Sequence, residues 1–318
     1  MSTRTKVSDL FTRDEIKALS APSDLAGWWA TLSIWGVIAL AFAMLAIWPN
    51  PFTFIVAVVI LGGRQLALAI LMHEASHHTL FRTRRLNDVV GNWLAGWFIW
   101  IDLHKYRVHH GVHHSRTGTD EDPDQSLVSP FPTTRASLRR KFLRDITGVG
   151  MFRRVLGLML MDMGALKWTV ASDVEWLPRN GRRWWNYAWQ GLRNMAPVLL
   201  VHALLLGVLA AAGHAWVYLA WVVAYGTTFS LFLRIRSIAE HACTEQTPDM
   251  LRNTRTTRAG WLARATVAPL HVNYHIEHHV LPAIPWFRLR KAHRMLRDRG
   301  YVAPAPGYAD VLRLAAGR

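Results

Sequence analysis

The chain has 318 residues, of which 51% are hydrophobic, and a formal net charge of +16 with histidine counted as neutral. The apolar residues are gathered into long runs with almost no charge, which argues against an ordinary soluble domain. The only cysteine is Cys243, which excludes an intrachain disulfide.

Four apolar runs along the chain are predicted to be transmembrane helices. A helix needs roughly 20 apolar residues to cross a bilayer, and these runs approach that length. The runs lie at about 26–48, 52–72, 196–212 and 215–233. The third is short and contains Pro197 and His202, and the second carries one charge, Arg64, which is expected to face protein, substrate or a polar pocket.

The remaining segments are predicted to form a helical cap at about 73–195 and 234–318. Within the cap, the apolar stretch 89–101 is too short to span and should lie in the interface or dip back into the membrane. The predicted fold class is an all-α integral membrane protein with one domain over 1–318. The cap would hold the metal centre that the histidines below indicate.

The basic residues indicate the orientation of the chain. The two short links outside the cap, at 49–51 and 213–214, contain no lysine or arginine, whereas every lysine and arginine except Arg64 lies in the three other segments. The positive-inside rule therefore predicts a multi-pass protein with the cap and both termini in the cytoplasm, and we expect a bacterial inner membrane. This distribution explains the net charge without a nucleic-acid partner.

Seven basic residues of the cap have two interpretations. They can hold anionic lipid headgroups, which we favour, or receive an acidic electron donor or a phosphate-bearing acyl carrier. They are Arg135, Arg139, Arg140, Lys141, Arg144, Arg153 and Arg154.

Most of the 16 histidines are clustered at the cytoplasmic side of the predicted helices. The clusters are His73, His77 and His78; His110, His113 and His114; His241, just past the fourth helix; and His275, His278 and His279. Residues three and four apart share one face of a helix, so each cluster can aim several imidazoles at one point. Ten histidines exceed the four ligands of a zinc site, and they suit two redox-active metal ions. One histidine alone would be an ordinary side chain, but three clusters ending in His-His argue against coincidence.

These residues resemble the membrane fatty acid desaturase superfamily, whose histidine boxes read His-x3-His-His, His-x2-His-His and His-x2-His-His. All three boxes occur here in order, with Tyr106-Arg107 before the second and Asp122-Pro123-Asp124 after it. The resemblance covers roughly 52–293. It implies a four-helix stem, a cytoplasmic cap with two iron ions (Fe2+/Fe3+), and dioxygen as cosubstrate.

The resemblance implies oxidation of a substrate carbon, but it leaves more than one product open. The leading prediction is a double bond introduced into a fatty acyl chain of a lipid or acyl thioester. The alternative is a hydroxylase or ketolase acting on a lipid or a terpenoid or carotenoid, because these enzymes share the boxes. A membrane metal transporter is a remote alternative, since it should place ligands inside its helices. No appended haem or flavin domain is apparent, so the electrons are expected from a separate ferredoxin or small cytochrome with its reductase.

The expected metal ligands are the ten clustered histidines. His241 is included because His78, five residues from His73, need not reach the metal, and because related desaturases have a further ligand after the last transmembrane helix. Five carboxylates are expected to accept the second N–H of ligand histidines, or else to cap helices or pair with arginines. They are Glu74, Glu240, Glu277, Asp122 and Asp124. Histidines outside the boxes, at 104, 109, 271 and 293, should support the site or lie at the surface, and His202 and His214 should be unrelated to it.

Overall fold

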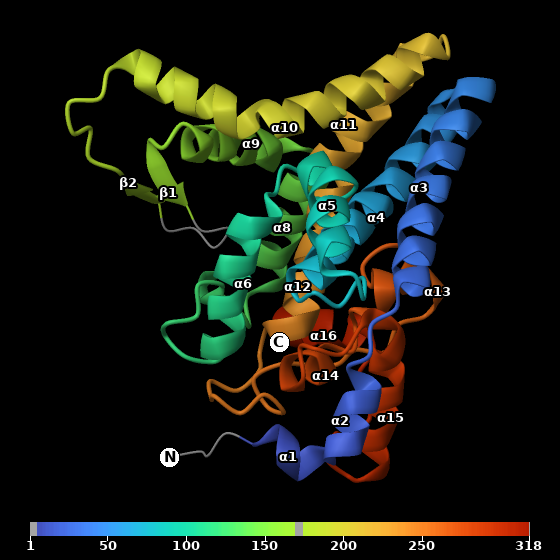
Figure 1. Cartoon of the computed structure of the whole chain (residues 1–318), viewed down its shortest axis with the longest axis vertical. Helices are drawn as coiled ribbons and strands as arrows, with labels where there is room; N and C mark the ends of the chain where they lie inside the picture. The colour runs from blue at the N-terminus through green and yellow to red at the C-terminus, as the bar shows by residue number, and fades with distance from the viewer. Residues whose placement is uncertain (1–4, 169–173, 318) are drawn as a thin grey trace.

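The computed structural model describes residues 5–168 and 174–317 of the chain. The predicted domain over 1–318 also includes the other residues, which lie outside the described part. The described part is helical, which confirms the predicted fold class (Figure 1). The one addition is a hairpin of β1 (Leu166–Trp168) and β2 (Val174–Trp176), paired antiparallel with Leu166 opposite Trp176.

Four helical runs are long and apolar enough to cross a membrane, as predicted. The first two are α3 (Asp24–Ile47) and α4 (Pro51–Ser76), and the third is α10 (Trp184–Ala211). The fourth comprises η2 (Ala215–Val217), α11 (Tyr218–Gly226) and α12 (Thr228–His241). Figure 1 shows the tips of both hairpins pointing away from the C-terminal helices, so the stem and the cap are separate regions.

The turn between α3 and α4 is closed by local capping. Asn50 is the N-cap of α4, and its Oδ1 accepts a hydrogen bond from the Thr53 amide at 3.0 Å. Pro51 follows at the first helical position, where its missing N–H costs nothing and its fixed φ suits the helix. The chain therefore reverses within three residues, as two adjacent antiparallel spans require.

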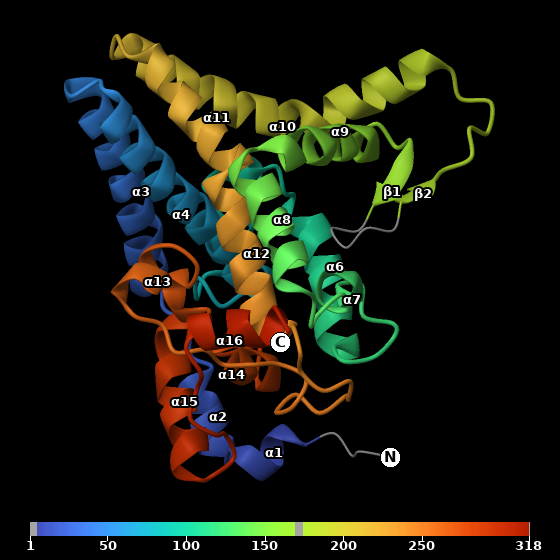
Figure 2. The ribbon, with the colours of Figure 1, turned by 180° about the vertical axis from the view of Figure 1, so that it is seen from behind.

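The third span begins earlier than the sequence indicates, at Trp184 instead of residue 196. The residues before Pro197 continue the helix and lie along α9 (Val149–Asp162), an arrangement visible in both views (Figures 1 and 2). Large apolar side chains on both helices are exposed, among them Trp189 and Phe152. A helix with such an exposed apolar face is typical of the membrane interface, which accounts for the extra length of α10.

Two adjacent glycines let α4 pack closely against its neighbours. A Cβ on Gly62 would lie 2.1 Å from Thr228 Oγ1, and a Cβ on Gly63 would lie 2.4 Å from the Ala265 carbonyl oxygen. Small residues at such positions are typical of helix contacts in membranes. The neighbouring Arg64 donates a 2.7 Å hydrogen bond to Ala265 O, so this charge faces protein, as expected.

We expect Gly62→Ala to destabilise the stem by about 1–3 kcal/mol, the usual cost of overpacking, because the new methyl group must displace Thr228. Thr228 Oγ1 donates a 2.8 Å hydrogen bond to the Val58 carbonyl, which that displacement would break. Thermal unfolding in detergent measures the change. Gly36→Ala is the matched control, since its Cβ would meet nothing within 4 Å. Equal unfolding temperatures for both variants would contradict the packing.

The cap joins the two ends of the chain. The helices α1 (Val7–Leu10) and α2 (Arg13–Leu19) pack on α15 (Leu289–Asp298) through an apolar cluster that includes Leu10, Leu19 and Leu296. The last helix, α16 (Tyr308–Ala315), packs on α12, as does α8 (Arg135–Ile146), and the three helices share one apolar cluster. Figure 2 shows α1 and α16 at the same end of the molecule, which an even number of spans requires.

The short apolar stretch predicted at 89–101 does not span. It forms the end of α5 (Arg84–Trp93) and η1 (Gly96–Ile99), which pack on α4. Trp35, three turns into α3, donates its indole N–H to the Leu94 carbonyl at 2.9 Å. The stretch therefore lies against the stem beside α3 and α4.

Candidate metal centre

Four helices bring the clustered histidines together. His73 lies in the last turn of α4, and His77 is the residue that caps its C-terminus. The second cluster lies on α6 (Leu103–Arg116), whose N-terminus is capped by Asp102 through bonds to two backbone amides. His241 is the last residue of α12, and the third box forms α14 (His275–Val280). Segments about 200 residues apart thus meet at the junction of stem and cap.

The donor atoms fall into three groups, each with its atoms within 4.8 Å of one another. The groups are His73, His77, His110, His114 and His278; His113, His241 and His279; and Glu240, His241 and His275. The last two groups share His241, so they describe one position with up to five donors. The structure therefore assembles two neighbouring donor sets from nine histidines and one carboxylate.

The spacing of the nitrogens suits metal ligation. His110 Nε2 and His114 Nε2 lie 3.0 Å apart, as do His114 Nε2 and His278 Nε2. In the other set, His241 Nε2 and His275 Nε2 lie 2.8 Å apart. Adjacent ligands about 2.1 Å from one ion at right angles would be about 3.0 Å apart. These ring nitrogens are therefore spaced as ligands of a common ion would be.

Burial keeps these imidazoles neutral and leaves several nitrogens without partners. It lowers the pKa of His77 to about 4 and holds the pKa values of His110 and His278 well below the ordinary value, with the neighbouring histidines adding to the effect. His73 Nε2 and His279 Nε2 are buried with no hydrogen-bond partner. Buried polar atoms are normally satisfied, and a neutral imidazole offers a lone pair, so the cluster fits metal ions.

His78 is the one predicted ligand that joins none of these groups among the described residues. Helix α4 ends at Ser76, and His78 has a φ of +59°, so the backbone turns there into the left-handed region. This turn separates His78 from the direction of its neighbour His77. Its ligation stays a prediction that the donor geometry disfavours.

Three of the predicted carboxylates contact clustered histidines directly. Asp122 Oδ1 lies 2.8 Å from His113 Nδ1, Glu74 Oε1 lies 3.4 Å from His73 Nδ1, and Glu240 Oε1 lies 3.7 Å from His275 Nδ1. Of these three contacts, the one between Asp122 and His113 is a hydrogen bond, and a carboxylate bonded to Nδ1 fixes the ring so that Nε2 faces the centre. Glu240 is itself held by Arg236, whose Nε donates to Oε1 at 2.8 Å.

The other two carboxylates make their shortest histidine contacts to histidines outside the donor sets. Asp124 Oδ1 lies 3.0 Å from His109 Nε2, and its other oxygen lies 3.6 Å from His113 Nδ1. Glu277 contacts His293 Nδ1 at 2.7 Å and accepts a 2.6 Å bond from Thr256 Oγ1.

Two of these contacts could not be predicted from the sequence. Nothing marks Arg236 or Thr256 in advance, because a single Arg or Thr has no characteristic spacing.

We expect Asp122→Asn to weaken metal binding by about 10- to 100-fold, the usual effect of losing a carboxylate behind a ligand histidine. The amide cannot hold the His113 imidazole with the same charge, so the ring loses its fixed orientation. Titration of the metal-depleted protein with Fe2+ measures the change. Glu121→Gln is the control, because Glu121 is an exposed neighbour that pairs with Arg116 at 2.8 Å. Equal affinities would contradict the role of Asp122.

The remaining histidines lie outside the cluster. His109 and His293 contact carboxylates as described, and His104 is exposed on α6. His202 lies in the stem, 2.8 Å from the Tyr218 hydroxyl, and His214 lies in the turn after α10. His271 lines a separate pocket beside α3.

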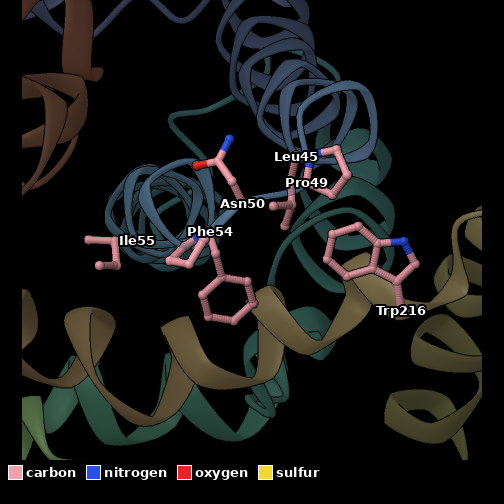
Figure 3. Close-up of a pocket in the computed structure, with 7 residues that line it drawn as sticks. Leu45, Pro49, Asn50, Phe54, Ile55 and Trp216 are labelled. Carbon is pink, nitrogen blue, oxygen red and sulfur yellow. The ribbon is translucent and has the colours of Figure 1, made fainter.

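A further hollow lies at the opposite end of the stem. Figure 3 shows Leu45, Pro49 and Phe54 around it, with Trp216 on the facing hairpin. Its lining is almost entirely apolar and contains no titratable side chain. It therefore is an apolar hollow between the hairpin tips and is remote from the histidines.

The sequence is similar to those of known proteins. The sequence model of the fatty acid desaturase family matches residues 49–306, so the chain belongs to that family. It is 27% identical over 315 residues to dihydrorhizobitoxine desaturase of Bradyrhizobium elkanii, covering 95% of this chain and 84% of that protein. It is 29% identical over 128 residues to the Delta(5) fatty acid desaturase fat-4 of Caenorhabditis elegans, covering 38% and 28%. The chain is a desaturase-like oxidoreductase associated with the membrane.

Proposed function

We propose that the nine grouped histidines hold two iron ions and that the protein introduces a carbon–carbon double bond into a fatty acyl chain. The observation that carries the proposal is the pair of donor sets joined at one site, with nitrogens 2.8–3.0 Å apart. The family is known for di-iron use, which supports iron over zinc. Ten donors also exceed what a single four-coordinate zinc ion can use.

The reaction removes two hydrogens from adjacent carbons. In balance, –CH2–CH2–, dioxygen, two electrons and two protons give –CH=CH– and two water molecules. Bound iron would supply the dioxygen activation that attack on an unactivated carbon requires. Desaturation is favoured over hydroxylation because both named relatives are desaturases.

The chain's own residues would prepare the site. Burial keeps the imidazoles unprotonated, so each can present a lone pair without competition from a proton. Asp122 would fix the His113 ring through its hydrogen bond to Nδ1, so that this donor is oriented before metal arrives. The His114 ring of α6 stacks on the His279 ring of α14 at 4.2 Å between centroids, and both are buried, which would exclude bulk water from the reacting carbons.

We further propose a separate electron donor and a cytoplasmic cap in a bacterial inner membrane. Exposed arginines on α8 and α9, among them Arg139, Arg140 and Arg153, support contact with anionic lipid or with an acidic ferredoxin or small cytochrome. Arg154 does not belong to that surface, because it donates to Ser230 Oγ at 2.9 Å and covers the Tyr225 ring.

The test is lipid analysis by mass spectrometry of cells that produce the protein, compared with cells that produce His278→Ala. We expect acyl chains that have lost two hydrogens in the first culture only. Chains that have gained one oxygen would replace desaturation with hydroxylation. Identical lipids in both cultures, with the protein loaded with iron and a donor present, would overturn the acyl-chain proposal.

A second substrate class follows from one comparison. The likeness to dihydrorhizobitoxine desaturase covers nearly the whole chain, whereas the likeness to the fatty acid desaturase covers 38%. We therefore propose dihydrorhizobitoxine as the alternative substrate. Incubation of producing cells with that compound would separate the two, since only one candidate should lose two hydrogens.

A further inference from the structure

A second pocket lies between the start of α3 and the cap. It has a volume of about 210 Å³, and its lining includes Trp29, Ser33, Arg264, Leu270, His271 and Trp286. The first two residues lie in the early turns of α3, and the others lie on or between α13 (Trp261–Ala265), η3 (Pro269–His271) and η4 (Trp286–Arg288). Figures 1 and 2 both show α13 beside the cap-side part of α3.

Two ring nitrogens of this pocket lack hydrogen-bond partners. Trp286 Nε1 and His271 Nδ1 are buried without a hydrogen-bond partner. Arg264 is exposed at the same pocket, and no carboxylate belongs to the described lining. Arginine and the tryptophan indole can only donate hydrogen bonds, so the missing partner must be an acceptor.

The charges around the pocket have one sign. Burial lowers the pKa of His271, and the nearby Arg264 and Arg290 lower it further. Two positive guanidinium groups near the unpaired indole N–H of Trp286 favour an anion with oxygen acceptors, because charge-assisted hydrogen bonds are the strong ones.

The backbone holds His271 in an unusual conformation. Leu270 and His271 have φ values of +50° and +58°, in the left-handed region that residues with a side chain rarely adopt. Such conformations persist where the surrounding structure enforces them, often at binding sites. The end of α13, which precedes these two residues, is bound to α4 through the hydrogen bond from Arg64 to Ala265 O.

Exposed apolar side chains flank the pocket on both sides. Trp29 and Leu32 are exposed on α3, and Trp261 and Leu262 are exposed on α13, with Trp261 82% exposed. Large apolar side chains at this density are typical of residues that contact lipid at the membrane interface. A ligand could therefore reach Arg264 from the bilayer.

The inner wall of the pocket touches the histidine cluster. The Trp286 backbone amide donates to Glu74 Oε2 at 3.0 Å, and Glu74 Oε1 lies 3.4 Å from His73 Nδ1. The Glu74 carboxylate thus lies between Trp286 and His73, a member of the first donor set.

We propose that this pocket binds the anionic head of the substrate, a carboxylate or phosphate on an apolar chain delivered from the membrane, with Arg264, His271 and the Trp286 indole as its donors. This assignment rests on the proposed desaturase function, since it makes the bound molecule the substrate. It gives the substrate a route from the bilayer past Trp286 to the histidines, separate from the water-facing side of the cap.

The test uses a dodecanoate probe that carries a photoreactive diazirine, with the protein in neutral-lipid nanodiscs. We expect crosslinks on peptides that contain Trp29 or Trp286, removed by excess dodecanoate or dodecyl phosphate and not by dodecanol. The better of the two anionic competitors identifies carboxylate or phosphate as the preferred head. Crosslinks elsewhere, or equal competition by dodecanol, would overturn the proposal.

Variants make the same test residue-specific. Arg264→Gln and Trp286→Phe should each reduce specific crosslinking by about tenfold or more, the factor equal to 1.4 kcal/mol. Arg294→Gln is the matched control, an exposed arginine of α15 that is not in the lining. Unchanged crosslinking in both pocket variants would contradict the assignment. Crosslinking needs no turnover, so a failure of the pocket and a failure of the desaturase function remain separable.

Discussion

His77→Ala is expected to lower turnover by more than about 100-fold, whereas His78→Ala should retain most of it. The loss of a carboxylate behind a ligand already costs up to about that factor, and the loss of a ligand should exceed it. His77 belongs to the five-histidine donor set, while its neighbour joins none of the described sets. The two variants remove the same side chain from adjacent positions of one box.

Iron content and turnover are measured for both variants, after gel filtration in detergent has shown that each remains folded. His77→Ala should lose iron from the first donor set, and His78→Ala should keep the full amount. Equal loss in both variants would show that the turn at His78 does not exclude it from the metal. Full activity in His77→Ala would contradict the role of His77 as a metal ligand.

His241→Ala is expected to have an effect of the same size, although this residue lies outside the three boxes. It ends α12, and its Nε2 lies 2.8 Å from His275 Nε2. Its ring also lies 4.9 Å from that of His113 and 5.1 Å from that of His279, between centroids. Removing it would leave the second position without the donor that its two groups share.

The matched control for His241→Ala is His104→Ala, an exposed histidine of α6 outside every group. The expected result is loss of about half of the iron and of the product in His241→Ala alone, with the protein folded. Two irons and normal turnover in His241→Ala would leave the centre to the three boxes.

Much of the site could be predicted because its information is local in the sequence. Histidines three and four apart on one helix converge, so boxes at 110–114 and 275–279 indicate shared targets before any fold is known. The spans were visible for the same reason, since a run of apolar residues is read directly from the chain. The exception is α10, where an interfacial segment continues the span through Trp184 and composition alone gave a boundary at 196.

The features that could not be predicted depend on contacts between distant segments. The pairing of His113 with a second donor set, and of His110 with the first, follows from where α12 and α14 meet α6. The pocket beside α3 joins Ser33 to Arg264, more than 200 positions apart, and no pattern links them. His78 illustrates the limit at short range. Its own left-handed backbone conformation, which no periodicity of the sequence indicates, turns it away from His77.

We propose that nine histidines from four helices hold a dinuclear iron centre. Elemental analysis combined with Mössbauer spectroscopy of 57Fe-enriched protein, produced under iron-replete conditions, tests it most directly. We expect two iron ions per chain in a coupled pair, and a smaller content in His77→Ala and His241→Ala. One zinc ion per chain and no iron would contradict the account.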